Sequence, residues 1–167
     1  MTVLVEPEER RYAFEAGTIG PELLKELGGL EVMRRIRDGG LPLAAIAQTV
    51  GFRLAEVEPG MVAFEGVPER FVYNMFGAAH GGYAATLLDS AMGCAVHTTV
   101  PRGSGYTTVD LTINYVRPVT VETGPVRAEG RVLHTGRRTA TAEGRLTAAG
   151  DGKLLAHGLT TCLILPL

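Results

Sequence analysis

The feature that most constrains the fold is a run of small and apolar residues in the middle of the chain. Residues 83–96 (YAATLLDSAMGCAV) contain no proline and are rich in alanine and leucine, which is typical of an α-helix of about 14 residues, roughly 21 Å long. The run is apolar on nearly every side, as is a helix that other parts of the protein cover. We therefore predict a buried central helix whose small residues, such as Ala84, Ala91 and Gly93, allow very close packing against a sheet.

Segments with the two-residue period of β-strands lie on both sides of this helix. In chain order the six predicted strands occupy residues 52–57, 61–67, 107–116, 126–134, 139–148 and 154–165. Residues 139–148 alternate alanine and leucine with charged and hydroxyl side chains, so one face of the sheet is expected to meet water. Two strands, a buried helix and four strands predict an α+β fold, in which an antiparallel sheet wraps a long central helix.

The beginning of the chain is rich in charged residues, and its apolar residues recur at the spacing of a helix rather than that of a strand. We predict a helical N-terminal extension at residues 1–45 and a main domain at residues 46–167. Apolar residues recur at helical spacing in 21–27 and in 30–37. Acidic residues balance the basic ones here, so we favour the solvated face of packing helices over a DNA-binding head.

Composition excludes several classes of protein. The chain has 167 residues, of which 46% are hydrophobic, enough for one domain with a sizeable core. Its net charge of −2 argues against nucleic acid as a partner. A membrane span needs roughly 20 predominantly apolar residues, which no segment offers, and the chain begins without the layout of a signal peptide. Cys94 and Cys162 make no metal-binding motif, so we expect a cytoplasmic protein without a metal.

One residue conflicts with an apolar helix. Asp89 is the only charged residue of the run, and Leu87, Leu88 and Met92 lie close to it in sequence. A buried carboxylate without a partner costs several kcal/mol, so its presence requires a reason. It either faces solvent at an edge, pairs with an arginine of the sheet, or lies in a sheltered cleft as a catalytic base or nucleophile. We favour the catalytic interpretation.

The sequence His80-Gly81-Gly82 comes directly before this helix. The first N–H groups of a helix have no partner within it and lie at the positive end of its dipole. Gly81 and Gly82 have no side chains, so a ligand oxygen can approach these donors. We expect a carbonyl bound at the Gly81 N–H to lie along a groove toward Asp89, with its developing oxyanion stabilised there. For His80 we favour capping of the turn over contact with the substrate.

Several separated elements together resemble one known family. They are Asn74, His80-Gly81-Gly82, Asp89, Thr108-Val109-Asp110-Leu111 and Tyr115-Val116-Arg117-Pro118. In spacing and order they are similar to the hotdog-fold acyl-CoA thioesterases of the PaaI type, over about residues 50–165. The resemblance implies the hotdog fold and a homodimer or homotetramer with its active sites at the dimer interface.

The resemblance also implies roles for individual residues. Asp89 attacks the thioester or activates water, and the Gly81 N–H polarises the carbonyl. Asn74 positions the water or the acid, and Thr108 contributes from the neighbouring subunit. Strict alternation, however, places Thr108 on the polar face of its strand with Asp110, away from the site unless a bulge turns it.

The chemistry expected of these groups is hydrolysis of an acyl- or aryl-CoA thioester to the free acid and CoA. One carboxylate and one oxyanion donor suffice for it, and coenzyme A is part of the substrate, so no cofactor is expected. Arg137 and Arg138, in a predicted hairpin loop, either contact the CoA phosphates or serve only solubility. Two alternatives stay open: an acyl-CoA hydratase or dehydratase, which would need a histidine and an acid acting together, and a non-catalytic acyl-CoA sensor, which would not need Asp89.

Overall fold

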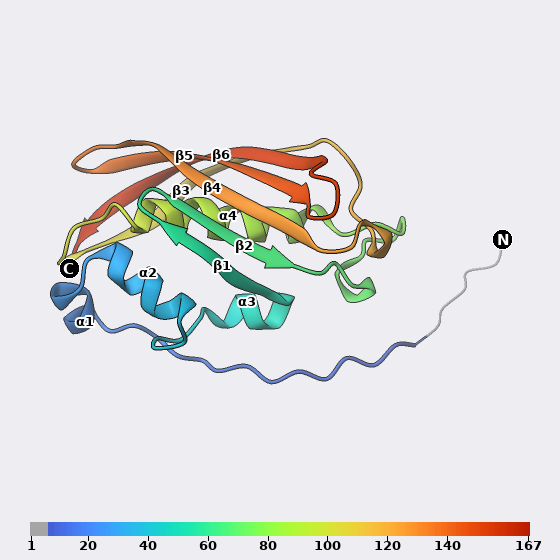
Figure 1. Ribbon diagram of the computed structural model, residues 1–167, viewed down its shortest axis with the longest axis horizontal. Coiled ribbons are helices and arrows are strands. Elements are labelled where there is room, and N and C mark those ends of the chain that lie inside the picture. Colours follow the sequence, from blue (N-terminus) through green and yellow to red (C-terminus); the bar gives the residue numbers. More distant parts are fainter. Residues whose placement is uncertain (1–6) are drawn as a thin grey trace.

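The computed structural model describes residues 7–167 and shows a six-stranded antiparallel sheet wrapped around one long helix (Figure 1). The helices are α1 (Pro21–Glu26), α2 (Gly29–Arg37), α3 (Ala45–Val50) and α4 (Gly81–His97), with short 3-10 helices η1 (Arg70–Val72) and η2 (Val121–Thr123). The strands are β1 (Phe52–Glu58), β2 (Met61–Gly66), β3 (Ser104–Tyr115), β4 (Val126–Thr135), β5 (Thr139–Ala148) and β6 (Leu154–Pro166). Their order in the sheet is β1-β2-β4-β5-β6-β3. The predicted α+β class and hotdog arrangement are confirmed.

The predicted extension is helical only in part. α1 and α2 lie where the apolar spacing predicts helices, and α2 packs on β1 and buries Val32 and Met33. Residues 1–6 of the extension lie outside the described residues, and residues 7–20 form no helix or strand. This extended stretch runs alongside α3 (Figure 1), where the Arg10 guanidinium donates to the Thr49 carbonyl at 2.6 Å.

The central helix rests directly on the backbone of the sheet. Leu87, Leu88 and Met92 of α4 are fully buried. Beneath the helix, Gly130 of β4 is paired with Gly144 of β5. A Cβ atom at Gly130 would lie 2.4 Å from the backbone carbonyl carbon of Ala91. Only a residue without a side chain therefore fits under this turn of α4, and the predicted close packing is confirmed.

Near its C-terminal end α4 carries a buried histidine. His97 is 8% exposed, and its Nδ1 atom has no hydrogen-bond partner among residues 7–167. Burial lowers the pKa of His97, because it disfavours the charged imidazolium. In the folded protein His97 is therefore neutral at pH values where an exposed histidine begins to take up a proton.

We expect this histidine to make the fold sensitive to mild acid. Below the pKa of an unfolded histidine, near 6.5, the unfolded chain binds a proton that the folded chain does not. The free energy of unfolding therefore decreases as the pH is lowered. The loss should continue until the pH passes the lower pKa of the folded state. His97→Gln should flatten the decline in urea unfolding between pH 7 and pH 5, whereas His157→Gln, at an exposed position, should not. Equal declines in all three proteins would contradict the expectation.

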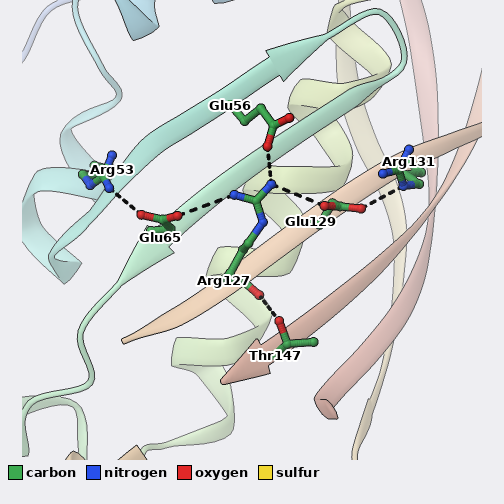
Figure 2. Close-up of polar contacts among 7 residues, drawn as sticks. All are labelled: Arg53, Glu56, Glu65, Arg127, Glu129, Arg131 and Thr147. Atoms are coloured by element: carbon green, nitrogen blue, oxygen red, sulfur yellow. Dashed lines mark hydrogen bonds and ion pairs between the residues drawn. The ribbon is translucent and has the colours of Figure 1, made fainter. Parts of the chain in front are cut away.

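The face of the sheet turned away from α4 carries a network of charged side chains (Figure 2). At its centre Arg127 of β4 forms an ion pair with Glu56 and approaches Glu65 at 3.5 Å and Glu129 at 3.4 Å. Two further arginines, Arg53 and Arg131, extend the network through Glu65 and Glu129. One half-buried guanidinium thus holds three carboxylates from β1, β2 and β4 together.

Arg127→Met is expected to lower the free energy of unfolding by about 1–2 kcal/mol, because it leaves three neighbouring carboxylates to repel one another. Urea unfolding at low and high salt measures the effect, and high salt should reduce it by screening. Arg53→Met removes one exposed contact and should change stability by less than about 0.5 kcal/mol. An Arg127→Met protein as stable as the parent at low salt would contradict the role given to Arg127.

Candidate functional site

The loop before α4 is shaped by its own hydrogen bonds. The Asn74 side-chain oxygen accepts from the Phe76 N–H at 2.8 Å, and the Asn74 N–H donates to the Ala78 carbonyl at 2.7 Å. The His80 N–H donates to the Val72 carbonyl at 2.7 Å, which fixes the end of the loop against η1. Asn74 therefore shapes the entry to the helix, and its action on a water molecule stays a prediction.

The first turn of α4 leaves one backbone donor free. His80 caps the helix, because its Nδ1 atom accepts from the Gly82 N–H at 3.0 Å. The Gly82 N–H is thus occupied by His80, and its use by the substrate stays a prediction. The Gly81 N–H donates to no acceptor among residues 7–167. Gly81 and His80 both line a cavity of about 460 Å³ beside the loop.

Asp89 lies on the flank of α4 that faces β3. Its side chain is half-buried, and the Thr108 hydroxyl donates to its Oδ1 atom at 2.9 Å. Within residues 7–167 no lysine, arginine or histidine forms an ion pair with it, so pairing with an arginine does not account for this acid. Asp89 is thus a carboxylate fixed through one oxygen by a neutral donor, in a position partly open to solvent.

Thr108 reaches Asp89 because β3 is irregular at this point. The pairing of β3 with β6 shifts between Thr108 and Asp110, so the alternation of side chains is broken there. The alternation that placed Thr108 away from the site is therefore a wrong guide at this residue. Within one chain Thr108 contacts Asp89, and its contribution to the site of a neighbouring subunit stays a prediction.

The two halves of the expected site are far apart within one chain. Gly81 and Asp89 are separated by eight residues of the same helix, which is about 12 Å along its axis. A single carbonyl group cannot lie against both. The expected groove that leads a bound carbonyl from Gly81 to Asp89 of the same chain is therefore wrong, and Asp89 does not line the cavity beside Gly81.

Arg137 and Arg138 lie away from the Gly81 end of the molecule. They belong to the hairpin between β4 and β5 and, with Ser104, line a different cavity of about 450 Å³. Ser104 begins β3, whereas Tyr115, which contacts Gly81, ends it. Within one chain these arginines therefore flank the end of β3 opposite to the free Gly81 amide.

Cys94 lies five residues after Asp89 on α4 and carries a thiol. Burial raises the pKa of its thiol to about 12, and the Tyr106 hydroxyl donates to its Sγ atom at 3.9 Å. A thiol with such a pKa is protonated at neutral pH and is a poor nucleophile. Asp89 is therefore the stronger candidate for attack on a substrate or for activation of water.

Residues 7–167 hold no group of three or more histidine, cysteine or acidic residues that is placed to bind a metal ion. None of the helices described has the length and apolar character required to cross a membrane.

The chain is similar in sequence to known proteins. A sequence model of the thioesterase superfamily matches residues 76–155. A protein of Halobacterium salinarum that is named as an esterase is 38% identical over 69 residues, which are 40% of this chain and 44% of that protein. The match thus spans less than half the length of this curated relative.

Solved structures share the fold over most of the chain. A conserved protein of Pseudomonas aeruginosa is 32% identical, with 74% of this chain and 95% of that chain covered and a TM-score of 0.68. A phenylacetic acid degradation-related protein of Ralstonia eutropha, described as a thioesterase, is 28% identical, with 78% and 98% covered and a TM-score of 0.70. A variant of the phenylacetic acid degradation protein PaaI of Thermus thermophilus is 27% identical, with 71% and 96% covered and a TM-score of 0.64. The chain therefore matches the thioesterase superfamily over residues 76–155 and has the fold of these solved structures.

Proposed function

We propose that the protein hydrolyses acyl- or aryl-CoA thioesters to the free acid and CoA, with Asp89 as general base or nucleophile. The observation that carries this proposal is the half-buried Asp89 carboxylate, held by the Thr108 hydroxyl at 2.9 Å and without an ion-pair partner among residues 7–167. The free Gly81 N–H at the start of the same helix supports the proposal, because it can serve as the oxyanion donor.

The Asp89–Thr108 contact suits either form of the reaction. As a base, Asp89 takes a proton from water while the water oxygen bonds to the thioester carbon, and the C–S bond then breaks to release the thiolate, which takes up the proton. As a nucleophile, an Asp89 oxygen bonds to that carbon and displaces the thiolate, and water then cleaves the resulting anhydride. In both forms Thr108 fixes one carboxylate oxygen and leaves the other available.

We propose that two subunits complete each site, in a homodimer or homotetramer. A catalytic carboxylate and an oxyanion donor must both lie near one carbonyl group, but about 12 Å of helix separates Gly81 from Asp89 within the chain. β3 is an edge strand of the sheet and exposes Val109 and Tyr115, so its outer edge is available to pair with a second copy. Antiparallel pairing of two β3 strands would bring the Gly81 end of one chain toward Asp89 of the other.

Mixing two inactive variants tests both the residues and the shared site. Asp89→Asn and Gly81→Val are expected to be inactive alone. If each site takes Asp89 from one chain and Gly81 from the other, a mixed dimer contains one intact site, so random remixing of the two should restore about a quarter of wild-type activity. If both groups act within one chain, every site keeps a lesion, and no activity returns.

The substrate class is tested by free-thiol release from short, medium, long and aryl acyl-CoAs. Arg137 and Arg138 remain proposed contacts for the CoA phosphates, and Arg137→Ala with Arg138→Ala should then raise KM for acyl-CoA more than for an acyl thioester that lacks the nucleotide. Tight binding of every acyl-CoA without any thiol release would overturn the proposed function.

A further inference from the structure

The first turn of α4 begins with two glycines, which is an unfavourable way to start a helix. Glycine loses more backbone freedom on folding than any other residue, so such a start opens easily unless neighbouring groups hold it. From one side, the Nδ1 atom of His80 accepts from the Gly82 N–H at 3.0 Å. A second contact holds the same turn through Gly81.

That second contact comes from the last residue of β3. The Tyr115 hydroxyl donates to the Gly81 carbonyl oxygen at 3.1 Å. The ring also lies against the glycine, because a Cβ atom at Gly81 would be 3.0 Å from both Cζ and Oη of Tyr115. Tyr115 and Gly81 line the same cavity of about 460 Å³. The phenol therefore fixes Gly81 at the edge of a space that a ligand can enter.

The contact with Tyr115 leaves the Gly81 N–H free to donate to a ligand. Tyr115 binds the carbonyl of Gly81, and His80 binds the N–H of Gly82, so neither competes for the Gly81 N–H. An oxyanion donor is effective when it is already aimed before the reaction begins, since no reorientation is then needed as charge develops. The Gly81 N–H lies in the peptide unit whose carbonyl, that of His80, accepts from the Tyr83 N–H at 2.9 Å. Tyr115 and the His80 side chain hold the next peptide unit, so both units that flank Gly81 are fixed.

We propose that Tyr115 is a positioning residue, which aims the Gly81 N–H at the carbonyl oxygen of the thioester. This inference rests on the proposed function, because it assigns Gly81 the oxyanion. Tyr115 acts only by positioning Gly81 and takes part in no chemical step itself.

Tyr115→Phe removes the hydroxyl and keeps the ring. We expect kcat to fall about tenfold and KM to change less than about twofold, because the interaction lost is one that acts in the transition state. Tyr106→Phe is the matched control. It removes a hydroxyl from the same strand, one whose contact is the Cys94 Sγ atom at 3.9 Å, and it should leave kcat unchanged.

Hydrogen exchange supplies a readout that does not depend on turnover. The Gly82 and Tyr83 amides both bond to His80 in the first turn. They should exchange several-fold faster in Tyr115→Phe than in the wild type and in Tyr106→Phe, because loss of the Gly81 contact lets this turn open.

The outcomes separate this inference from the proposed function. An active wild type with an unchanged Tyr115→Phe overturns the role of Tyr115 and leaves the hydrolase intact. A higher KM at unchanged kcat also overturns it, since that result indicates direct contact with the ground-state substrate. A wild type that hydrolyses no thioester overturns the proposed function, and the positioning role with it.

Discussion

Asp89→Asn is expected to lower kcat for thioester hydrolysis by about a thousand-fold and to change KM little. Asparagine has the shape of aspartate and can still accept from the Thr108 hydroxyl, which donates to Asp89 Oδ1 at 2.9 Å. It can neither take a proton from water nor attack the thioester carbon. Free-thiol release under saturating substrate measures the loss.

Asp110→Asn is the control for this experiment. Asp110 is an exposed acid of β3, two residues after Thr108, and makes no side-chain ion pair among residues 7–167. Its replacement changes the net charge by the same amount and should leave kcat within about twofold. Thermal unfolding shows whether both variants are folded. A folded Asp89→Asn protein with wild-type turnover would remove the carboxylate from the mechanism.

Gly130→Ala is expected to destabilise the fold by about 3 kcal/mol or more. The new methyl group would lie 2.4 Å from backbone atoms of Ala91, and backbone in the middle of a helix cannot move aside without shifting the whole of α4. Urea unfolding measures the change in free energy. Such a loss is a large part of the stability of a domain of this size.

Gly144→Ala is the matched comparison, on the neighbouring strand and in register with Gly130. Its methyl group would meet Met92 at 2.9 Å and Leu88 at 3.0 Å, both through side-chain atoms. Flexible side chains can adjust, so we expect a cost of about 1 kcal/mol. Equal losses at the two positions would show that the backbone contact of Gly130 is not the decisive one.

The sequence predicted the fold where a local pattern alone determines it. β5 begins and ends at the predicted residues 139 and 148, because its alternation is unbroken, and α4 lies on the run that is apolar on nearly every side. Residues 7–20 show why the extension was less predictable: charge and composition did not reveal that they form no helix.

The sequence singled out candidate site residues but could not give their arrangement in space. Asp89 could be found because a charge in an apolar helix needs an explanation. The place of Thr108 depends on a shift in the pairing of β3 with β6, and a two-residue period cannot show such a shift. Tyr115 belongs to the motif that carries the family resemblance, but its contact with Gly81 depends on where β3 ends relative to α4. Spacing along the chain contains no such information.

The contact between Gly130 and the backbone of Ala91 also limits how such a protein can change its substrate. Rotation of side chains cannot adjust two backbones that touch, so α4 can neither slide nor turn over the sheet. Asp89 is carried by that same helix, two residues before Ala91. In the proposed two-subunit site, new acyl preferences must therefore arise in the groups around a fixed carboxylate, namely the β3 edge and, from the second subunit, the loop at residues 73–80.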